Sequence, residues 1–178
     1  MRIKNDDTHF GLAAIGLHWA MAVLIIGLLI LGFFMVLLPV SLQKLKLYGW
    51  HKEYGFLALF LVAVRLLWRL SNPTPRLNLP RWEVLSARSV HWLFYALMLL
   101  MPLTGWLITS SAGLPASFFG WFTLPNLTGP DEHLRQVFEQ AHEWLAYALL
   151  GLIALHTAAA LKHYFINKDD ILQRMISP

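Results

Sequence analysis

The sequence predicts an all-α protein: an integral membrane four-helix bundle, both termini cytoplasmic, with residues 1–178 forming a single membrane domain. The chain is 57% hydrophobic and only 13% charged, with a mean hydropathy of +0.54, whereas soluble domains carry about 25% charged residues. Four long apolar segments are continuous rather than alternating, as expected of helices that satisfy their own backbone hydrogen bonds in lipid. The unequal distribution of Lys and Arg between alternate connections gives the orientation.

The four predicted helices follow these apolar segments. Residues 11–39 form the first, because Trp19 to Val40 contains no charged residue. This run is longer than the roughly 7–15 apolar residues of a signal peptide and no small-x-small site follows it, so we expect an uncleaved span. The second helix covers about residues 48–70, the third 89–109 and the fourth 139–165. Each is close to or above the ~20 residues that cross a bilayer.

The connections between these helices differ in length and composition. The second contains Pro73, Pro75 and Pro80, which end the preceding helix and keep the loop extended. The third, residues 110–138, is the longest, and we expect a periplasmic loop that lies partly at the membrane interface because it is rich in aromatic residues. Asp131 to Gln140 could add a helical turn or two before the fourth span. The aromatic residues concerned are Phe118, Phe119, Trp121 and Phe122.

Lys and Arg residues are concentrated on one side of the predicted bundle. The side of both termini and the second connection carries 10 of them, whereas the side of the first and third connections carries 4. The positive-inside rule therefore places both termini in the cytoplasm. Nucleic-acid binding is the rival explanation of a net charge of +4 and a pI of 9.6, and the four spans argue against it. The 10 residues are Arg2, Lys4, Arg65, Arg69, Arg76, Arg81, Arg88, Lys162, Lys168 and Arg174.

Eight His and no Cys make imidazole the obvious strong ligand for a metal ion in this chain. His142 and His156 are 14 residues apart in one predicted helix, which separates them by about 21 Å in depth and keeps them within about 40° of one face. Because successive helices run in opposite directions, we expect His18 at the inner depth of His156 and His51 at the outer depth of His142. Each pair could supply the two axial nitrogens of a low-spin haem b, so that the bundle would hold two haems b.

Other ionisable residues lie near these depths. Zinc is the rival occupant, but it prefers three or four ligands at one depth, and Glu143 is the only nearby candidate. Arg65, at the inner depth, could pair with haem propionates or serve as a snorkelling anchor. His91 could replace an inner iron ligand, line a quinone pocket or hydrogen-bond a neighbour. His163 could form a quinone or proton site with Lys162, or lie at the interface without a chemical role.

Several short motifs resemble those of the bacterial cytochrome b561 family, the four-helix, di-haem b proteins of the inner membrane. The resemblance covers essentially the whole chain and implies two haems b that exchange electrons between the periplasmic side and membrane quinone. It also implies one haem ligand from the first helix, one from the second and two from the fourth, which are His18, His51, His142 and His156. The motifs are Gly16-Leu17-His18-Trp19, Trp50-His51-Lys52, Arg65-Leu66-Leu67-Trp68-Arg69, Phe119-Gly120-Trp121-Phe122, Ala141-His142-Glu143 and Ala159-Ala160-Leu161-Lys162-His163-Tyr164-Phe165.

These observations favour a b-type cytochrome that transfers electrons between a periplasmic redox partner or small reductant and ubiquinone or menaquinone in the membrane. Lys44, Lys46 and Lys52 in and after the first connection could attract a small anionic reductant. The alternative is a membrane-anchor cytochrome b subunit of a dehydrogenase or hydrogenase, since two His in the last helix also resemble those subunits. A transporter or structural protein without a cofactor is the third class, and it would be colourless when purified.

Overall fold

The computed structural model describes residues 3–75 and 79–177, and Arg2 and Arg76, two of the charges counted for orientation, lie outside them. Four long helices make up most of the described chain: α1 (Leu12–Leu37), α2 (Leu42–Ser71), α3 (Arg81–Ser111) and α4 (Glu132–Lys162). A π-helical turn, η1 (His163–Asn167), continues α4, and a short 3-10 helix, η2 (Gln173–Met175), follows it. Two short strands, β1 (Ala116–Phe118) and β2 (Phe122–Leu124), lie between α3 and α4.

All four helices are long and apolar enough to cross a membrane, with hydropathies of 1.6 to 3.0 over their best windows. This confirms the predicted class, an all-α membrane four-helix bundle. Three helices begin six to eight residues before the expected positions 48, 89 and 139. Polar caps explain two of these extensions, because Ser41 accepts a hydrogen bond from the Lys44 N–H and Asp131 accepts one from the Leu134 N–H. The helical turns expected between Asp131 and Gln140 are confirmed as the start of α4.

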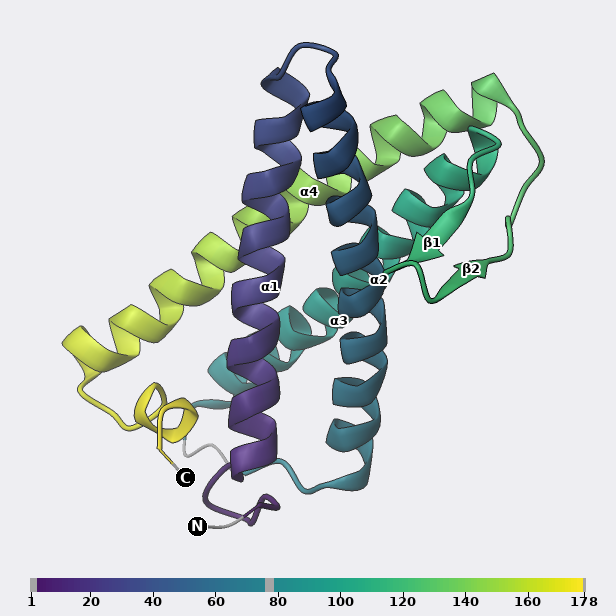
Figure 1. The fold of residues 1–178 in the computed structure, drawn as a ribbon. Helices are drawn as coiled ribbons and strands as arrows, with labels where there is room; N and C mark the ends of the chain where they lie inside the picture. Colours follow the sequence, from purple (N-terminus) through teal and green to yellow (C-terminus); the bar gives the residue numbers. More distant parts are fainter. Residues whose placement is uncertain (1–2, 76–78, 178) are drawn as a thin grey trace.

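The helices form two antiparallel pairs that cross at a wide angle (Figure 1). In the figure α1 and α2 stand side by side, while α3 and α4 run obliquely behind them. We call the end of the bundle that holds both chain termini the terminal end. The opposite end, with the α1–α2 turn and the β1–β2 segment, is the loop end. Since both termini meet at one end, the four spans alternate in direction as predicted.

Two small apolar clusters hold the helices together. One joins Leu29 of α1 and Leu97 of α3 to Leu149 and Leu152 of α4. Most other large apolar side chains point outward, and Ile30 and Leu67 are 64% and 67% exposed. Such an outward apolar surface suits hydrocarbon rather than water as the solvent. The second cluster consists of Met21, Val62, Tyr95 and Met98.

The loop between α3 and α4 contains a β-hairpin that the sequence analysis did not foresee. β1 and β2 pair antiparallel, with Ala116 opposite Leu124. Phe119 and Gly120 form the turn with positive φ of 49° and 72°, a conformation that glycine adopts without strain. The Phe119 ring packs edge-on against Tyr54 of α2, with ring centres 5.3 Å apart. Strands of three residues are too short to show an alternating pattern in the sequence.

Candidate functional site

Four His side chains meet as two pairs at opposite ends of the bundle. His51 of α2 faces His142 of α4 near the loop end, with ring centres 6.2 Å apart. His18 of α1 faces His156 of α4 near the terminal end, with ring centres 6.3 Å apart. These are the two combinations that depth alone suggested, and we call them the loop-end pair and the terminal-end pair. The 14-residue interval within α4 separates them by about 21 Å.

The separation of the two rings within each pair fits two imidazoles that hold one iron ion between them. Ring centres are about 6 Å apart when two imidazoles ligate an ion from opposite sides, because each metal–nitrogen bond is about 2 Å long and the ring centre lies about 1 Å further. Among the described residues no three His, Cys, Asp or Glu side chains are placed to hold one metal ion. Two nitrogens per site are what a haem iron requires, since its porphyrin supplies the other four.

A hydrogen bond to Thr104 of α3 orients His142. The Thr104 hydroxyl lies 2.9 Å from His142 Nδ1 and also donates to the carbonyl oxygens of Leu100 and Met101, at 3.0 and 2.8 Å. Because the single hydroxyl hydrogen goes to these carbonyls, the Thr104 oxygen accepts from His142 Nδ1–H. The lone pair of His142 is therefore on Nε2, the nitrogen left free to ligate iron. Its partner His51 keeps a buried Nδ1 that has no hydrogen-bond partner in the described structure.

Two glycines face the rings of the loop-end pair. A Cβ atom on Gly32 of α1 would lie 3.3 Å from His51 Cε1, and one on Gly105 of α3 would lie 3.4 Å from His142 Cε1. These helices can therefore approach the imidazoles closely only because both positions lack a side chain. The sequence analysis missed them, although a signal exists. Gly32 is 14 residues after His18, and Gly105 is 14 residues after His91, which places each glycine on the face of that His at the other depth.

The terminal-end pair has a third imidazole beside it. The ring of His91, from α3, lies 5.9 Å from that of His156, which is as close as the ring of His18. Phe94, one turn along α3, packs edge-on against the same His156 ring at 5.3 Å. The structure therefore brings His91 to the terminal-end pair. By distance, His18 and His91 are equally suited to be the partner of His156.

Arg65 of α2 joins this cluster of imidazoles. Its Nη2 lies 2.9 Å from His18 Nδ1, and the Tyr95 hydroxyl is a further hydrogen-bond partner. A guanidinium only donates, so His18 Nδ1 accepts this bond. A neutral imidazole has only one unprotonated nitrogen. If His18 bound iron through Nε2, its Nδ1 would carry the hydrogen and could no longer accept from Arg65. The Arg65 guanidinium would then have to donate to another acceptor. A haem propionate is an acceptor of the right charge and planar shape.

The remaining predicted residues have different surroundings. Lys44 donates to the carbonyl oxygen of Leu38 at 2.7 Å and caps the end of α1, while Lys46 lies 5.2 Å from the centre of the Trp50 ring. Glu143 is exposed and accepts a 3.3 Å hydrogen bond from the Tyr147 hydroxyl. Lys162 is exposed at the end of α4, and His163 is half-buried beside it.

The fold and the paired imidazoles define a membrane b-type cytochrome. Residues 9–178 match the family described as prokaryotic cytochrome b561, and the chain belongs to that family. It is 35% identical to cytochrome b561 homolog 2 of Escherichia coli (strain K12), over 99% of this chain and 95% of the relative. It is 32% identical to cytochrome b561 homolog 1 of the same organism, over 71% and 72%. It is 30% identical to the probable superoxide oxidase CybB of Yersinia pestis, over 91% and 92%.

Membership of this family confirms several predictions made from the sequence. The protein is a haem b-binding electron carrier, and it is a multi-pass protein of the bacterial inner membrane in contact with lipid.

Proposed function

We propose that this protein carries electrons across the inner membrane, from a donor on the periplasmic side to ubiquinone or menaquinone, through two haems b. The arrangement of four imidazoles as two facing pairs, one at each end of α4, is the observation that supports this most directly. His51 and His142 would hold one haem near the loop end. His18 and His156 would hold the other near the terminal end, where both termini are cytoplasmic in this proposal.

Each haem supplies reversible one-electron chemistry when it is bound. His51 with His142, and His18 with His156, would each hold one haem through two imidazoles, which would favour electron transfer over the binding of oxygen. Between the two levels lies the cluster of Leu29, Leu97, Leu149 and Leu152, which keeps water out of the space between them. Arg65 would pair with the propionates of the terminal-end haem. His91 stands beside that site as a candidate for contact with quinone.

We propose a small anionic reductant as the electron donor, and superoxide is the leading candidate because a relative is described as a probable superoxide oxidase. Two superoxide ions lose one electron each and become two molecules of oxygen. One quinone takes up those two electrons with two protons and becomes quinol. Lys44, Lys46 and Lys52 provide positive charge around the loop end, which would raise the local concentration of an anion.

A membrane-anchor subunit of a dehydrogenase or hydrogenase is the alternative function. The hairpin between α3 and α4 favours it, because Trp121 at the hairpin is 80% exposed and the loop could dock a soluble subunit. In the main proposal residues 110–138 are instead a periplasmic loop that lies partly at the membrane interface. A soluble subunit that copurifies in equal amount would favour the anchor function.

The deciding experiment is an absorbance spectrum of the purified protein, with haem counted per chain, followed by reconstitution with quinone. We expect two low-spin haems b per chain and quinol formation when superoxide is generated on the periplasmic side. A colourless protein, or one haem per chain, would contradict the di-haem proposal. Two haems that superoxide does not reduce would contradict the donor and leave the haem sites standing.

A further inference from the structure

The end of α4 has an unusual backbone. The α-helix changes to the π-helical turn His163–Asn167, and Lys168 then adopts the left-handed conformation with φ of 54°. A residue other than glycine is uncommon in this region and is strained there. The reversal points the next residue, Asp169, back toward the turn it follows. Single π-helical turns in α-helices frequently occur at functional sites.

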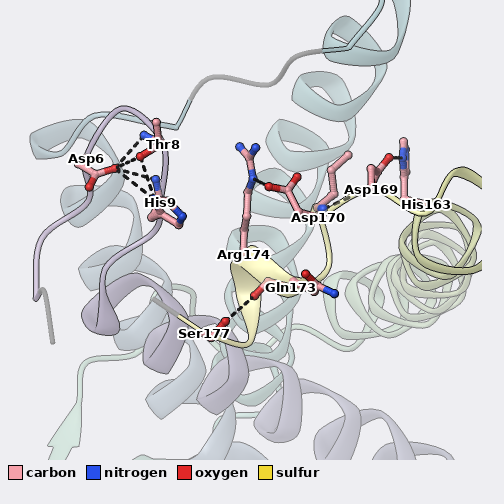
Figure 2. A network of polar contacts seen from close by, with 10 residues as sticks. Asp6, Thr8, His9, His163, Asp169, Asp170, Gln173, Arg174 and Ser177 are labelled. Atoms are coloured by element: carbon pink, nitrogen blue, oxygen red, sulfur yellow. Dashed lines mark hydrogen bonds and ion pairs between the residues drawn. The ribbon is translucent and has the colours of Figure 1, made fainter.

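The product of this reversal is a close contact between His163 and Asp169 (Figure 2). His163 Nδ1 lies 2.5 Å from Asp169 Oδ2, and the two side chains are 14% and 27% exposed. The other oxygen of Asp169 accepts from the backbone N–H of Ile171 at 3.2 Å. Both residues are thus held in place, yet each keeps some access to water.

The contact indicates which nitrogen of the imidazole ring carries a hydrogen. A carboxylate accepts, so Nδ1 carries the hydrogen that is shared with Asp169. Asn167 Nδ2 lies 3.1 Å from the same nitrogen, but an amide NH2 group only donates, so it forms no hydrogen bond with the protonated Nδ1. Nε2 is left as the nitrogen that can take up and release a proton. This arrangement of an imidazole oriented by a carboxylate is typical of side chains that transfer protons.

The position of His163 relates it to the terminal-end pair. His163 is seven residues after His156 on α4, which puts it about 10 Å further toward the terminal end and within about 20° of the same face. The segment that carries Asp169 is fastened across this end, because Trp19 Nε1, beside His18, donates to the Met175 carbonyl oxygen at 2.6 Å. The contact thus lies between the terminal-end pair and the water at that end.

The neighbouring charges form a separate group. Arg174 Nε donates to Asp170 Oδ2 at 3.0 Å, and this hydrogen bond holds the pKa of Asp170 below its usual value. The charge of His9, in the N-terminal segment, also lowers the pKa of Asp170. Figure 2 shows Asp170 and Arg174 beside the contact of His163 with Asp169. The exposed Lys162 and Lys168 flank the turn in the sequence. Asp170 is therefore a matched control, because it is the adjacent carboxylate but is hydrogen-bonded to Arg174 rather than to His163.

We propose that His163 and Asp169 form a proton relay that serves the reduction of quinone at the terminal end. The inference rests on the proposed function, because a quinone must take up two protons with its two electrons to become quinol. His163 Nε2 gives up a proton toward the reduced quinone and regains one from the water at that end. Asp169 keeps Nδ1 protonated, orients the ring and stabilises the charged imidazolium between the two transfers.

The test uses the full chain with its haems in liposomes that contain ubiquinone. The variants are His163→Gln, His163→Ala and Asp169→Asn, with Asp170→Asn as the control. In His163→Gln we expect unchanged haem content, spectrum and haem reduction, and quinol formation slowed on the order of 10²-fold. Asp169→Asn should have a smaller loss, of roughly 10-fold, and Asp170→Asn none. Added imidazole should restore part of the rate in His163→Ala, which a purely structural role would not allow.

Several outcomes would overturn the relay. The relay is wrong if His163→Gln forms quinol at the rate of the unchanged protein, or if Asp170→Asn slows it as much as Asp169→Asn. If His163→Gln loses haem, the Asp169→Asn variant decides, and a full rate with intact haems in that variant excludes the relay. A failure of the proposed function would be seen in a different protein sample. The unchanged protein itself would then bind no haem or form no quinol, and the relay would fail with it.

Discussion

The loop-end pair and the terminal-end pair have nearly the same ring separation, 6.2 and 6.3 Å, but very different surroundings. At the loop end the rings face glycines and a threonine hydroxyl, and each imidazole has one evident partner. At the terminal end a third imidazole, His91, and the guanidinium of Arg65 lie against the pair. At the loop end, the lack of side chains on Gly32 and Gly105 makes room beside the rings. At the terminal end, the charged guanidinium of Arg65 lies against them.

This difference predicts a direction for the proposed electron path. Positive charge near an iron ion disfavours its oxidised form and so raises its reduction potential. Arg65 lies at the terminal-end pair, and the guanidinium of Arg69 lies 5.8 Å from the centre of the nearby Tyr95 ring. We therefore expect the terminal-end haem to have the higher potential. Electrons that enter at the loop end would then move toward the terminal end, where the proposed quinone reduction takes place.

The largest expected effect comes from removing an axial imidazole. His142→Ala should lose the loop-end haem and His156→Ala the terminal-end haem, so that each variant falls from two haems per chain to one, because each of these His residues would supply one of the two imidazoles that hold its haem. His91→Ala should keep both. Haem counting by absorbance, with the two haems separated by redox titration, measures this.

The terminal-end assignment is the more vulnerable of the two, because three imidazoles compete there. If His91→Ala removed a haem and His18→Ala did not, His91 would be the partner of His156 and the pairing by depth would be wrong. Among the described residues no third imidazole lies beside the loop-end pair, so we expect His51→Ala to lose that haem.

The glycines of the loop end provide the second prediction. Gly32→Val and Gly105→Val should strongly reduce the occupancy of the loop-end haem, because a Cβ at either position already lies 3.3 to 3.4 Å from a ligand ring and a branched side chain extends further. Gly27→Val, on the same helix as Gly32 but with nothing within 4 Å of its Cβ position, is the control. Equal loss of both haems, or equal loss in the control, would show a general packing defect instead.

Much of the difference between the two sites could be predicted from the sequence, because the sites lie on regular helices. Helical periodicity fixes which residues share a face and a depth, and the interval of 14 residues connects His142 with His156 and His51 with Arg65. The same interval, applied to His18 and His91, would have found Gly32 and Gly105. Periodicity cannot find Asp169, since its contact with His163 depends on a π-helical turn and a left-handed Lys168. It also cannot choose between His18 and His91, which lie at one depth.

Thr104 tests the orientation of the loop-end ligand. Thr104→Val keeps the shape of the side chain and removes the oxygen that accepts from His142 Nδ1–H. We expect the loop-end haem to bind about 10-fold more weakly, the low end for loss of a partner that orients a metal ligand, while Thr104→Ser should retain the affinity. The rate of haem loss to a scavenging apoprotein measures this. A change at the terminal-end haem instead would mean that Thr104 acts through the packing of α3.

Arg65 gives the smallest effect and the one that decides whether charge sets the direction of transfer. Arg65→Gln should lower the midpoint potential of the terminal-end haem, because a positive charge about 10 Å from an iron ion contributes on the order of 1 kcal/mol at an effective dielectric constant of about 20. That energy corresponds to roughly 50 mV for a one-electron couple. Arg65→Lys should keep most of the potential, since it keeps the charge, and Arg88→Gln, at an exposed position on α3, should change little. Redox titration of the two haems distinguishes the cases. If both potentials shifted equally, or if Arg65→Lys behaved like Arg65→Gln, the guanidinium would act by holding His18 in place, and the difference in charge between the two sites would not drive the electron.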